Sequence, residues 1–235
     1  MVEYRWSPFQ RLALSIYKNR PANIAQVGVC DGKINDPIYF LVKKYIKTNK
    51  IILIEPQLDL HNLIRKNYNF HNNKYILNCA IGNPGTLRLY KLNKIYYPLF
   101  IGDNLPQILK DAPKYRAPAG FVSSSFEHVF RHLRGNLPPH IDCAKAIIHA
   151  DVKCCSLAEA IAPADVKAID ILQIDAEGMD HTVIYNANID RYRPALINFE
   201  YNHLSRDGRQ QLASYLEAAG YRLSPVSTNG TDLRL

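Results

Sequence analysis

Short apolar runs alternate with amphipathic stretches along most of the chain. Residues 24–29, 51–55 and 75–81 form apolar runs that predict strands, and residues 86–92 alternate as an additional strand. Between them, residues 37–45 and 58–68 predict helices, the first with Asp36 as N-cap and Pro37 at its first position. This order of elements is typical of a parallel sheet that helices cover on both faces.

The same pattern resumes in the last third of the chain. Residues 169–175 and 195–200 predict two more strands, residues 209–219 a helix with Gly220 as its cap, and residues 221–226 and 231–235 a terminal pair. Residues 93–150 interrupt the pattern with a mixture of Pro, Tyr, His and short helical pieces. We therefore expect one α/β domain over residues 1–235, with residues 93–150 inserted as a cap or substrate wall.

The net charge of +8 is concentrated in one half of the chain. Residues 1–120 hold the basic excess, which could attract nucleic acid, acidic glycans or a membrane surface. The lysines are scattered rather than gathered in a block, so an ordinary solvated surface is favoured and nucleic acid is not the expected partner. No apolar run approaches the roughly 18 residues of a membrane span, and the N-terminus does not read as a signal peptide. These observations favour a cytoplasmic protein.

Five cysteines are present, an odd number without a disulfide-like spacing. Reduced thiols are the default expectation for such a set. One cluster invites a metal interpretation, namely His140, Cys143, His149, Cys154 and Cys155. It lacks the tight ligand pairs of a zinc site, so no metal is expected there.

Unusual polar residues follow each predicted strand. Gly28 to Gly32 follow the first, Glu55 the second, and Asp175 and Glu177 the fourth. Ligands of open α/β sheets bind at this edge, and an acidic residue after the second strand can accept hydrogen bonds from ribose hydroxyls. A dinucleotide would require G-x-G-x-x-G for its pyrophosphate. The loop here is G-x-x-x-G with Asp31 inside it, which suits the cationic, phosphate-free S-adenosylmethionine (SAM) better.

In this order of motifs the sequence resembles the FkbM family of methyltransferases over most of residues 24–235. The matching segments are G-x-x-D-G at 28–32 with the strand before it and N-D-P at 35–37 after it, I-E-P at 54–56, A-I-G at 80–82, S-L at 156–157, I-D-x-E-G at 174–178, F-E-x-x-H-L at 199–204, G-Y at 220–221 and T-D at 231–232. Several motifs in the same order are stronger than any one of them. Cys30 stands where the family often has alanine.

The resemblance implies a class I, Rossmann-like fold with a seven-stranded, mostly parallel sheet. It implies SAM-dependent O-methylation of a sugar, a glycan or a hydroxylated natural product. It places the cofactor at the strand ends, with Ser124 or Ser125 of the insertion nearby. The predicted cofactor-binding residues are Gln26, Gly28, Asp31, Gly32, Asp36, Glu55, Pro56, Ala80, Ser125 and Asp175.

The predicted catalytic residues are Asp175, Glu200 and His203. Methyl transfer to an alcohol requires removal of its proton, to which a positioned base contributes about 10²–10⁴-fold. We expect Asp175 beside the methionine end of the cofactor and Glu200 or His203 beside the acceptor. Glu177, and His128 and His132 from the insertion, are further candidates.

Three alternatives stay open at this level. A divalent metal could bind Asp175, Glu177 and Glu200, although the spacing does not demand it. An NAD-dependent oxidoreductase or epimerase is disfavoured by the missing G-x-G-x-x-G. A nucleic-acid-binding module would not need carboxylates at the cleft. The sequence fixes neither the acceptor nor the oligomeric state, and a homo-oligomer is an open alternative.

Overall fold

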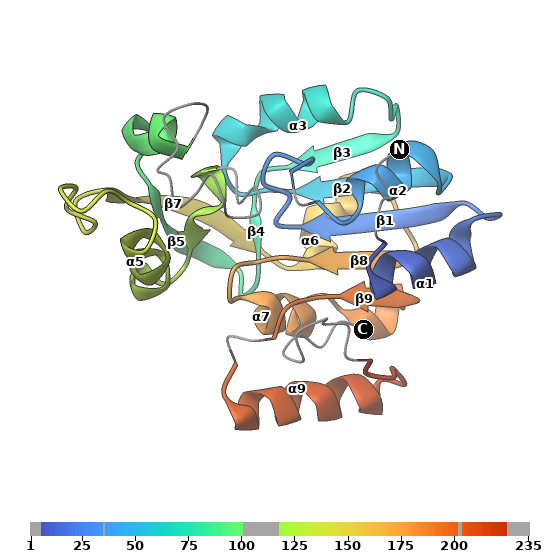
Figure 1. Cartoon of the computed structure of the whole chain (residues 1–235). Helices are drawn as coiled ribbons and strands as arrows, with labels where there is room; N and C mark the ends of the chain where they lie inside the picture. Colours follow the sequence, from blue (N-terminus) through green and yellow to red (C-terminus); the bar gives the residue numbers. More distant parts are fainter. Residues whose placement is uncertain (1–5, 35, 101–117, 202–203, 225–235) are drawn as a thin grey trace.

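The computed structural model of the protein describes residues 6–34, 36–100, 118–201 and 204–224. Its central feature is a sheet of five parallel strands in the order β3-β2-β1-β8-β9 (Figure 1). These strands are β1 (Ala22–Val27), β2 (Thr48–Ile54), β3 (Lys74–Leu77), β8 (Ile171–Ile174) and β9 (Leu196–Asn198). The chain runs outward from β1 to β3 and then returns to the other side of β1, so the strand order reverses between β1 and β8. Such a reversal opens a crevice at the carboxyl ends of the strands.

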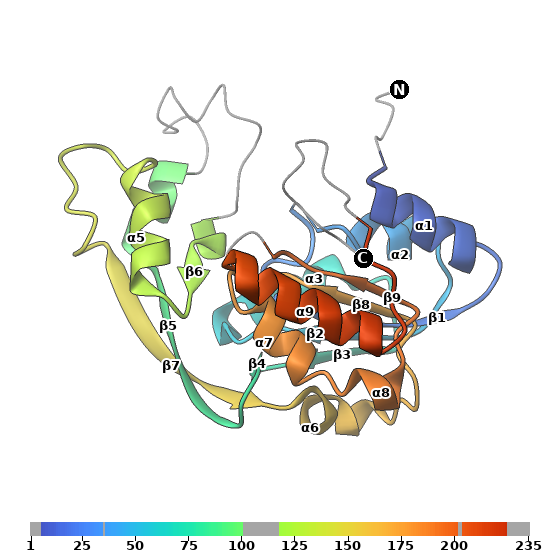
Figure 2. The ribbon, with the colours of Figure 1, turned by 90° about the horizontal axis from the view of Figure 1, so that it is seen from below.

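Helices cover both faces of this sheet, as the sequence predicted (Figure 2). One face carries α1 (Pro8–Tyr17), α2 (Tyr39–Lys44) and α3 (His61–Asn67). The other face carries α6 (Leu157–Ile161), α7 (Asp180–Tyr185), α8 (Ile189–Tyr192) and α9 (Arg206–Ala218). Short 3-10 turns are η1 (Leu58–Leu60), η2 (Lys94–Phe100), η4 (Pro118–Gly120) and η5 (Ala162–Ala164).

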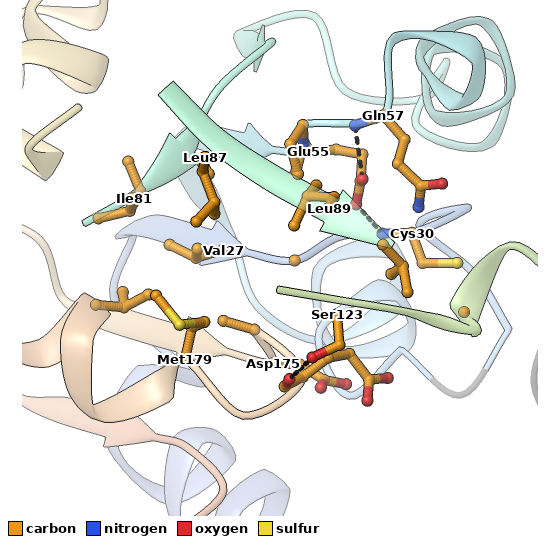
Figure 3. Close-up of a pocket in the computed structure, with 18 residues that line it drawn as sticks. Val27, Cys30, Glu55, Gln57, Ile81, Leu87, Leu89, Ser123, Asp175 and Met179 are labelled. Carbon is orange, nitrogen blue, oxygen red and sulfur yellow. Dashed lines mark hydrogen bonds between the residues drawn. The ribbon is translucent and has the colours of Figure 1, made fainter. Parts of the chain in front are cut away.

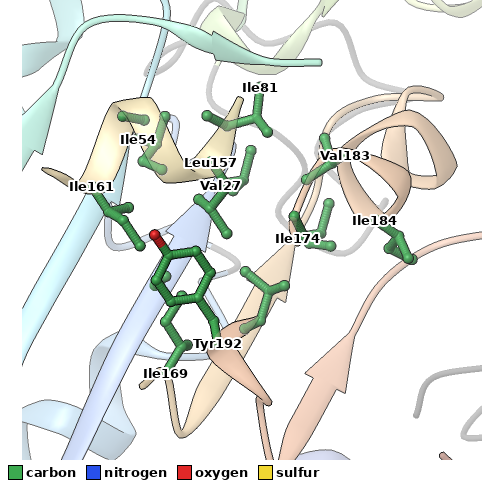
Figure 4. Packing of buried hydrophobic residues seen from close by; sticks show 14 of the residues in the cluster. Val27, Ile54, Ile81, Leu157, Ile161, Ile169, Ile174, Val183, Ile184 and Tyr192 are labelled. Carbon is green, nitrogen blue, oxygen red and sulfur yellow. The ribbon is translucent and has the colours of Figure 1, made fainter. Parts of the chain in front are cut away.

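The strands read as continuous apolar runs because both of their faces are buried. In β2, Ile51 and Leu53 pack under α1, α2 and α3, whereas Ile52 and Ile54 pack with α6 and α7 on the other side. Figure 4 shows this second core, in which Ile54 lies with Ile174 of β8 and with side chains of α6 and α7 such as Leu157 and Val183. Because both faces of the sheet are buried, the ends of its strands have fixed positions. The first residues of the loops that follow the strands are therefore fixed as well.

A second sheet extends from the carboxyl edge of the first (Figure 2). Its order is β4-β7-β5-β6, built from β4 (Ala80–Ile81), β5 (Gly85–Leu92), β6 (Val122–Ser123) and β7 (Ile147–Cys155). Strands β5 and β7 are antiparallel, and helix α5 (Phe126–Arg134) packs on this sheet. The second sheet has its own small core of Leu92, Phe121, Val129, Leu133 and Ala146.

The division into two sheets corrects the prediction of one seven-stranded sheet, although the α/β class is as predicted. Residues 75–81 read as one strand, but the structure ends β3 at Leu77 and starts β4 at Ala80. Between them the Asn78 side chain donates hydrogen bonds to the carbonyls of Glu55 (3.4 Å) and Pro56 (2.9 Å). The chain therefore turns away from β2, and β4 pairs with β7.

Several predicted boundaries shift for local reasons. Asp36 accepts hydrogen bonds from the backbone of Ile38 (2.7 Å) and Tyr39 (2.9 Å), so it caps a turn just before α2. Helix α9 starts at Arg206 because Ser205 caps it. Residues 221–224 are not a strand, and the rest of the predicted terminal pair lies outside the described residues. The inserted segment 93–150 is framed by β5 and β7. Within the described ranges, no helix is long and apolar enough to cross a membrane.

Candidate functional site

A pocket lies at the carboxyl edge of the five-stranded sheet, roofed by β5 of the second sheet (Figure 3). It encloses about 680 Å³ of empty space, including space open to solvent. Its polar lining comes from the segments after β1, β2 and β8 and from β6, and its apolar lining from Val27, Ala80, Ile81, Leu87, Leu89, Val122, Met179 and Val183, among others. Two sheets therefore form its walls.

Glu55, directly after β2, is the most deeply buried carboxylate of the pocket at 3% exposure. Its Oε2 accepts a hydrogen bond from the backbone of Cys30 (2.8 Å), and its Oε1 accepts one from Gln57 (2.9 Å) (Figure 3). Each carboxylate oxygen retains a further lone pair for a ligand hydroxyl. Burial raises the pKa of Glu55 to about 7, against the lowering effect of those hydrogen bonds.

This raised pKa makes the stability of the ligand-free protein depend on pH. The pKa of Glu55 rises from its ordinary value of 4.5 to about 7 in the folded protein. Between pH 4.5 and 7 the folded state therefore binds more protons at Glu55 than the unfolded state does. The contribution is fully present below the unfolded pKa and is lost as pH rises toward 7. We expect chemical denaturation to show about 3 kcal/mol more loss of stability from pH 4.5 to 8 in wild type than in Glu55→Gln. Asp180, whose pKa burial raises to about 6, is common to both proteins. Equal losses in the two would contradict the prediction.

Gly28 lies where β1 meets the loop after β8. Its φ is +77°, and a Cβ atom there would lie 1.8 Å from the carbonyl oxygen of Asp175. The Asp175 backbone N–H also donates to Val27 (2.9 Å). The sequence predicted that this glycine admits a ligand; the close approach seen here is between two segments of the chain itself.

The rest of the G-x-x-x-G loop shapes the turn. Asp31 Oδ1 accepts hydrogen bonds from the backbone of Lys33 (2.9 Å) and Ile34 (2.8 Å). Gly32 has φ +69° and lies against the Tyr68 ring, where a Cβ would meet it at 3.0 Å. Neither residue lines the pocket in this structure. The same is true of Gln26 and Asp36, whose side chains bond to each other at 3.1 Å in the interior.

The loop after β8 brings two carboxylates to the pocket, those of Asp175 and Glu177. The Ser123 hydroxyl of β6 donates to the Glu177 carbonyl (2.9 Å; Figure 3). His128 Nε2 of α5 lies 3.6 Å from Glu177 Oε2. The second sheet and its helix thus contact this loop directly.

Some of the predicted site residues line the pocket and others do not. Gly28, Glu55, Pro56, Ala80 and Asp175 line the pocket together. Ser125 caps α5, and its backbone N–H bonds to Ser123. Glu200 does not line the pocket; its backbone N–H donates to Asp180 (3.0 Å), which ties the loops after β8 and β9 together. His203 lies outside the described residues.

Sequence reasoning missed Ser123, Gln57 and the apolar residues of β5. Gln57 follows Glu55 by two positions, and its Nε2 donates to the carbonyl of Ala119 (3.1 Å), which joins the segment after β2 to the turn η4 that precedes β6. The alternation of residues 86–92 could have indicated that one face of that strand is covered, but not by what. In the described parts of the chain, no three His, Cys, Asp or Glu side chains are placed to hold a metal ion.

A doubly wound parallel sheet, with a pocket at its switch point and a buried acid after the second strand, is typical of α/β proteins that bind a ligand at their strand ends. A family model described as the methyltransferase FkbM domain matches residues 26–223. The chain belongs to this family.

Three solved structures are similar to the chain. Methyltransferase FkbM from Methylobacillus flagellatus KT has 11% identity to this chain and a TM-score of 0.48, and the match covers 91% of this chain and 42% of that protein's chain. The chain thus spans less than half of that protein. An O-methyltransferase from Bacillus cereus in complex with SAH has 13% identity, a TM-score of 0.42 and coverage of 99% and 81%. Precorrin-6y C5,15-methyltransferase from Geobacter metallireducens GS-15 has 12% identity, a TM-score of 0.38 and coverage of 92% and 71%. No curated protein matches the sequence.

Proposed function

We propose that this chain is a SAM-dependent methyltransferase that methylates a hydroxyl oxygen. One observation carries the choice of cofactor. Three carboxylates, Glu55, Asp175 and Glu177, line the pocket, and its described lining contains no Lys or Arg. SAM carries a sulfonium and an ammonium group, which carboxylates attract. The pyrophosphate of NAD would meet the same carboxylates without a cation to neutralise it.

The residues present fit SAM as a bound group. Glu55 would hold the ribose, because its two oxygens are fixed by backbone donors and can each accept a hydroxyl. The apolar wall of Ile81, Leu87 and Leu89 suits an adenine ring. Asp175, on the far side of β1, would lie beside the amino group, as the sequence suggested. When bound, SAM supplies an electrophilic methyl group.

The chain's own part in such a reaction is alignment, exclusion of water and proton removal. Roofing by β5 shields the strand ends from solvent, and fixed donor and acceptor positions account for much of the rate of a displacement. Asp175, Glu200 and His203 stay the proposed groups for positioning and proton removal. The acceptor class, a sugar, glycan or hydroxylated natural product, rests on family resemblance. The proposed acceptor-facing part of the wall is β6, whose Val122 and Ser123 line the pocket.

Calorimetric titration with SAM, S-adenosylhomocysteine (SAH) and NAD tests the proposal. We expect SAM and SAH to bind and NAD to give no heat at the same concentrations, because only NAD brings uncompensated negative charge into the pocket. Binding of NAD, or of none of the three, would contradict the proposed function.

A further inference from the structure

Glu177 has a backbone conformation that few residues of its kind adopt. Its φ is +48°, in the left-handed region, and Gly178 follows with φ +98°. A residue other than glycine raises the conformational energy of the backbone by roughly 1–2 kcal/mol in this conformation. Strain of this kind persists where surrounding contacts impose it, and it is concentrated at functional sites.

The surrounding contacts come from the second sheet and its helix. Ser123 is 3% exposed and holds the Glu177 carbonyl, while His128, 8% exposed, lies against the carboxylate. Only 15% of the Glu177 side chain is exposed. Both ends of the residue are therefore fixed, and its carboxylate has a defined position in the pocket wall.

The sheet order places this carboxylate opposite Glu55. Glu55 follows β2 and Glu177 follows β8, and β1 lies between those two strands. Figure 3 shows Glu55 and Asp175 on opposite sides of the pocket. A ligand whose ribose is held at Glu55 and which extends across β1 brings the atoms beyond its ribose toward the loop that holds Asp175 and Glu177. In SAM and SAH the sulfur is bonded directly to the ribose 5′ carbon, before the amino acid end.

We propose that Glu177 recognises the positive charge on the sulfur and so makes the site prefer SAM to SAH. The inference rests on the proposed function. The two compounds share the ribose, the adenine and the amino group, and differ at the sulfur by one methyl group and one positive charge. A fixed carboxylate near the sulfur attracts the sulfonium of SAM but not the neutral thioether of SAH. The preference favours release of the spent compound after transfer.

The test is titration at pH 8 with SAM, SAH and sinefungin, in which a carbon that carries an amine replaces the sulfur that carries the methyl group. Glu177→Gln is nearly isosteric and removes only the charge. We expect it to lower the affinity ratio of SAM to SAH five- to tenfold, and to weaken sinefungin as it weakens SAM. A change in the ratio of less than twofold would overturn the inference.

The neighbouring carboxylate supplies the matched control. Asp175→Asn should weaken SAM and SAH equally and leave their ratio within twofold, because both compounds carry the amino group. If Asp175→Asn changed the ratio as much as Glu177→Gln, the assignment to Glu177 would be overturned. Should Glu177→Gln fail to fold, Glu177→Gly removes the carboxylate at a backbone conformation that glycine adopts readily, and a ratio equal to that of wild type would overturn the inference.

The two proposals fail in different ways. If wild type binds neither SAM nor SAH, the proposed function is contradicted and Glu177 has no such role. If wild type binds both and Glu177→Gln leaves their ratio unchanged, only the role of Glu177 is contradicted.

Discussion

Glu55→Ala is expected to weaken SAH binding by about 100- to 1000-fold, because hydrogen bonds to a charged group contribute roughly 1.5–3 kcal/mol each and two ribose hydroxyls would lose their acceptor. The substitution also removes the acceptor that holds the Cys30 and Gln57 backbone, so the loops around the ribose lose their anchor. Calorimetric titration of wild type and variant with SAH measures the loss directly.

Asp59→Asn is the matched control for that measurement. Asp59 lies four residues after Glu55, forms ion pairs with Lys91 (3.7 Å) and Lys94, and does not line the pocket. Its substitution should leave SAH affinity within about twofold, since Asp59 does not line the pocket and, among the described residues, donates or accepts no hydrogen bond there. If Glu55→Ala kept wild-type affinity, the ribose would have to bind elsewhere.

Gly28→Ala should destabilise the fold by more than about 3 kcal/mol. Its φ of +77° disfavours any side chain, and the new Cβ would lie 1.8 Å from the Asp175 carbonyl, an approach that only a shift of β1 or β8 can relieve. Equilibrium denaturation in urea gives the free energy of unfolding of each protein.

Gly85→Ala separates the two causes. Gly85 also has a positive φ, +143°, but a Cβ there would meet no atom within 4 Å. Its substitution should cost about 1–2 kcal/mol, the backbone penalty alone. Equal losses at the two glycines would show that the contact with Asp175 does not matter.

The central sheet was predictable because its signals are local. Apolar runs of strand length, some of which end in a carboxylate such as Glu55 or Asp175, predicted parallel strands and the edge at which they end. A strand whose side chains are buried on both faces needs an almost continuous run of apolar residues, which is easy to recognise in a sequence. The pocket residues found in this way, Gly28, Glu55 and Asp175, lie directly after β1, β2 and β8, whereas Ala80, which the family resemblance implied, is the first residue of β4.

The second sheet depends on contacts between distant segments and was not predictable. Residues 75–81 read as one strand because Asn78 and Cys79 do not interrupt the apolar pattern strongly; the turn comes from the hydrogen bonds of Asn78 to the loop after β2. Likewise, nothing near Glu177 in the sequence indicates that Ser123 and His128 contact it.

Asp31 and Gly32 show a different limit of sequence reasoning. An aspartate and a glycine in a loop can contact a ligand or form the turn, and both uses select the same residue types. Here the Asp31 carboxylate accepts backbone N–H groups of its own loop. Only the three-dimensional contacts distinguish the two uses.

The separate core of the second sheet has a consequence for how such a protein diversifies. Its buried cluster around Leu92, Val129 and Leu133 is distinct from the two cores that flank the main sheet. Leu87, Leu89 and Ser123 project from this sheet into the shared pocket, whereas Glu55 belongs to the main sheet. Substitutions at Leu87 and Leu89 can therefore change the wall that β5 forms, while Glu55 on the main sheet keeps its own hydrogen bonds. The residues that line one pocket can thus vary in one layer of the molecule independently of the other layer.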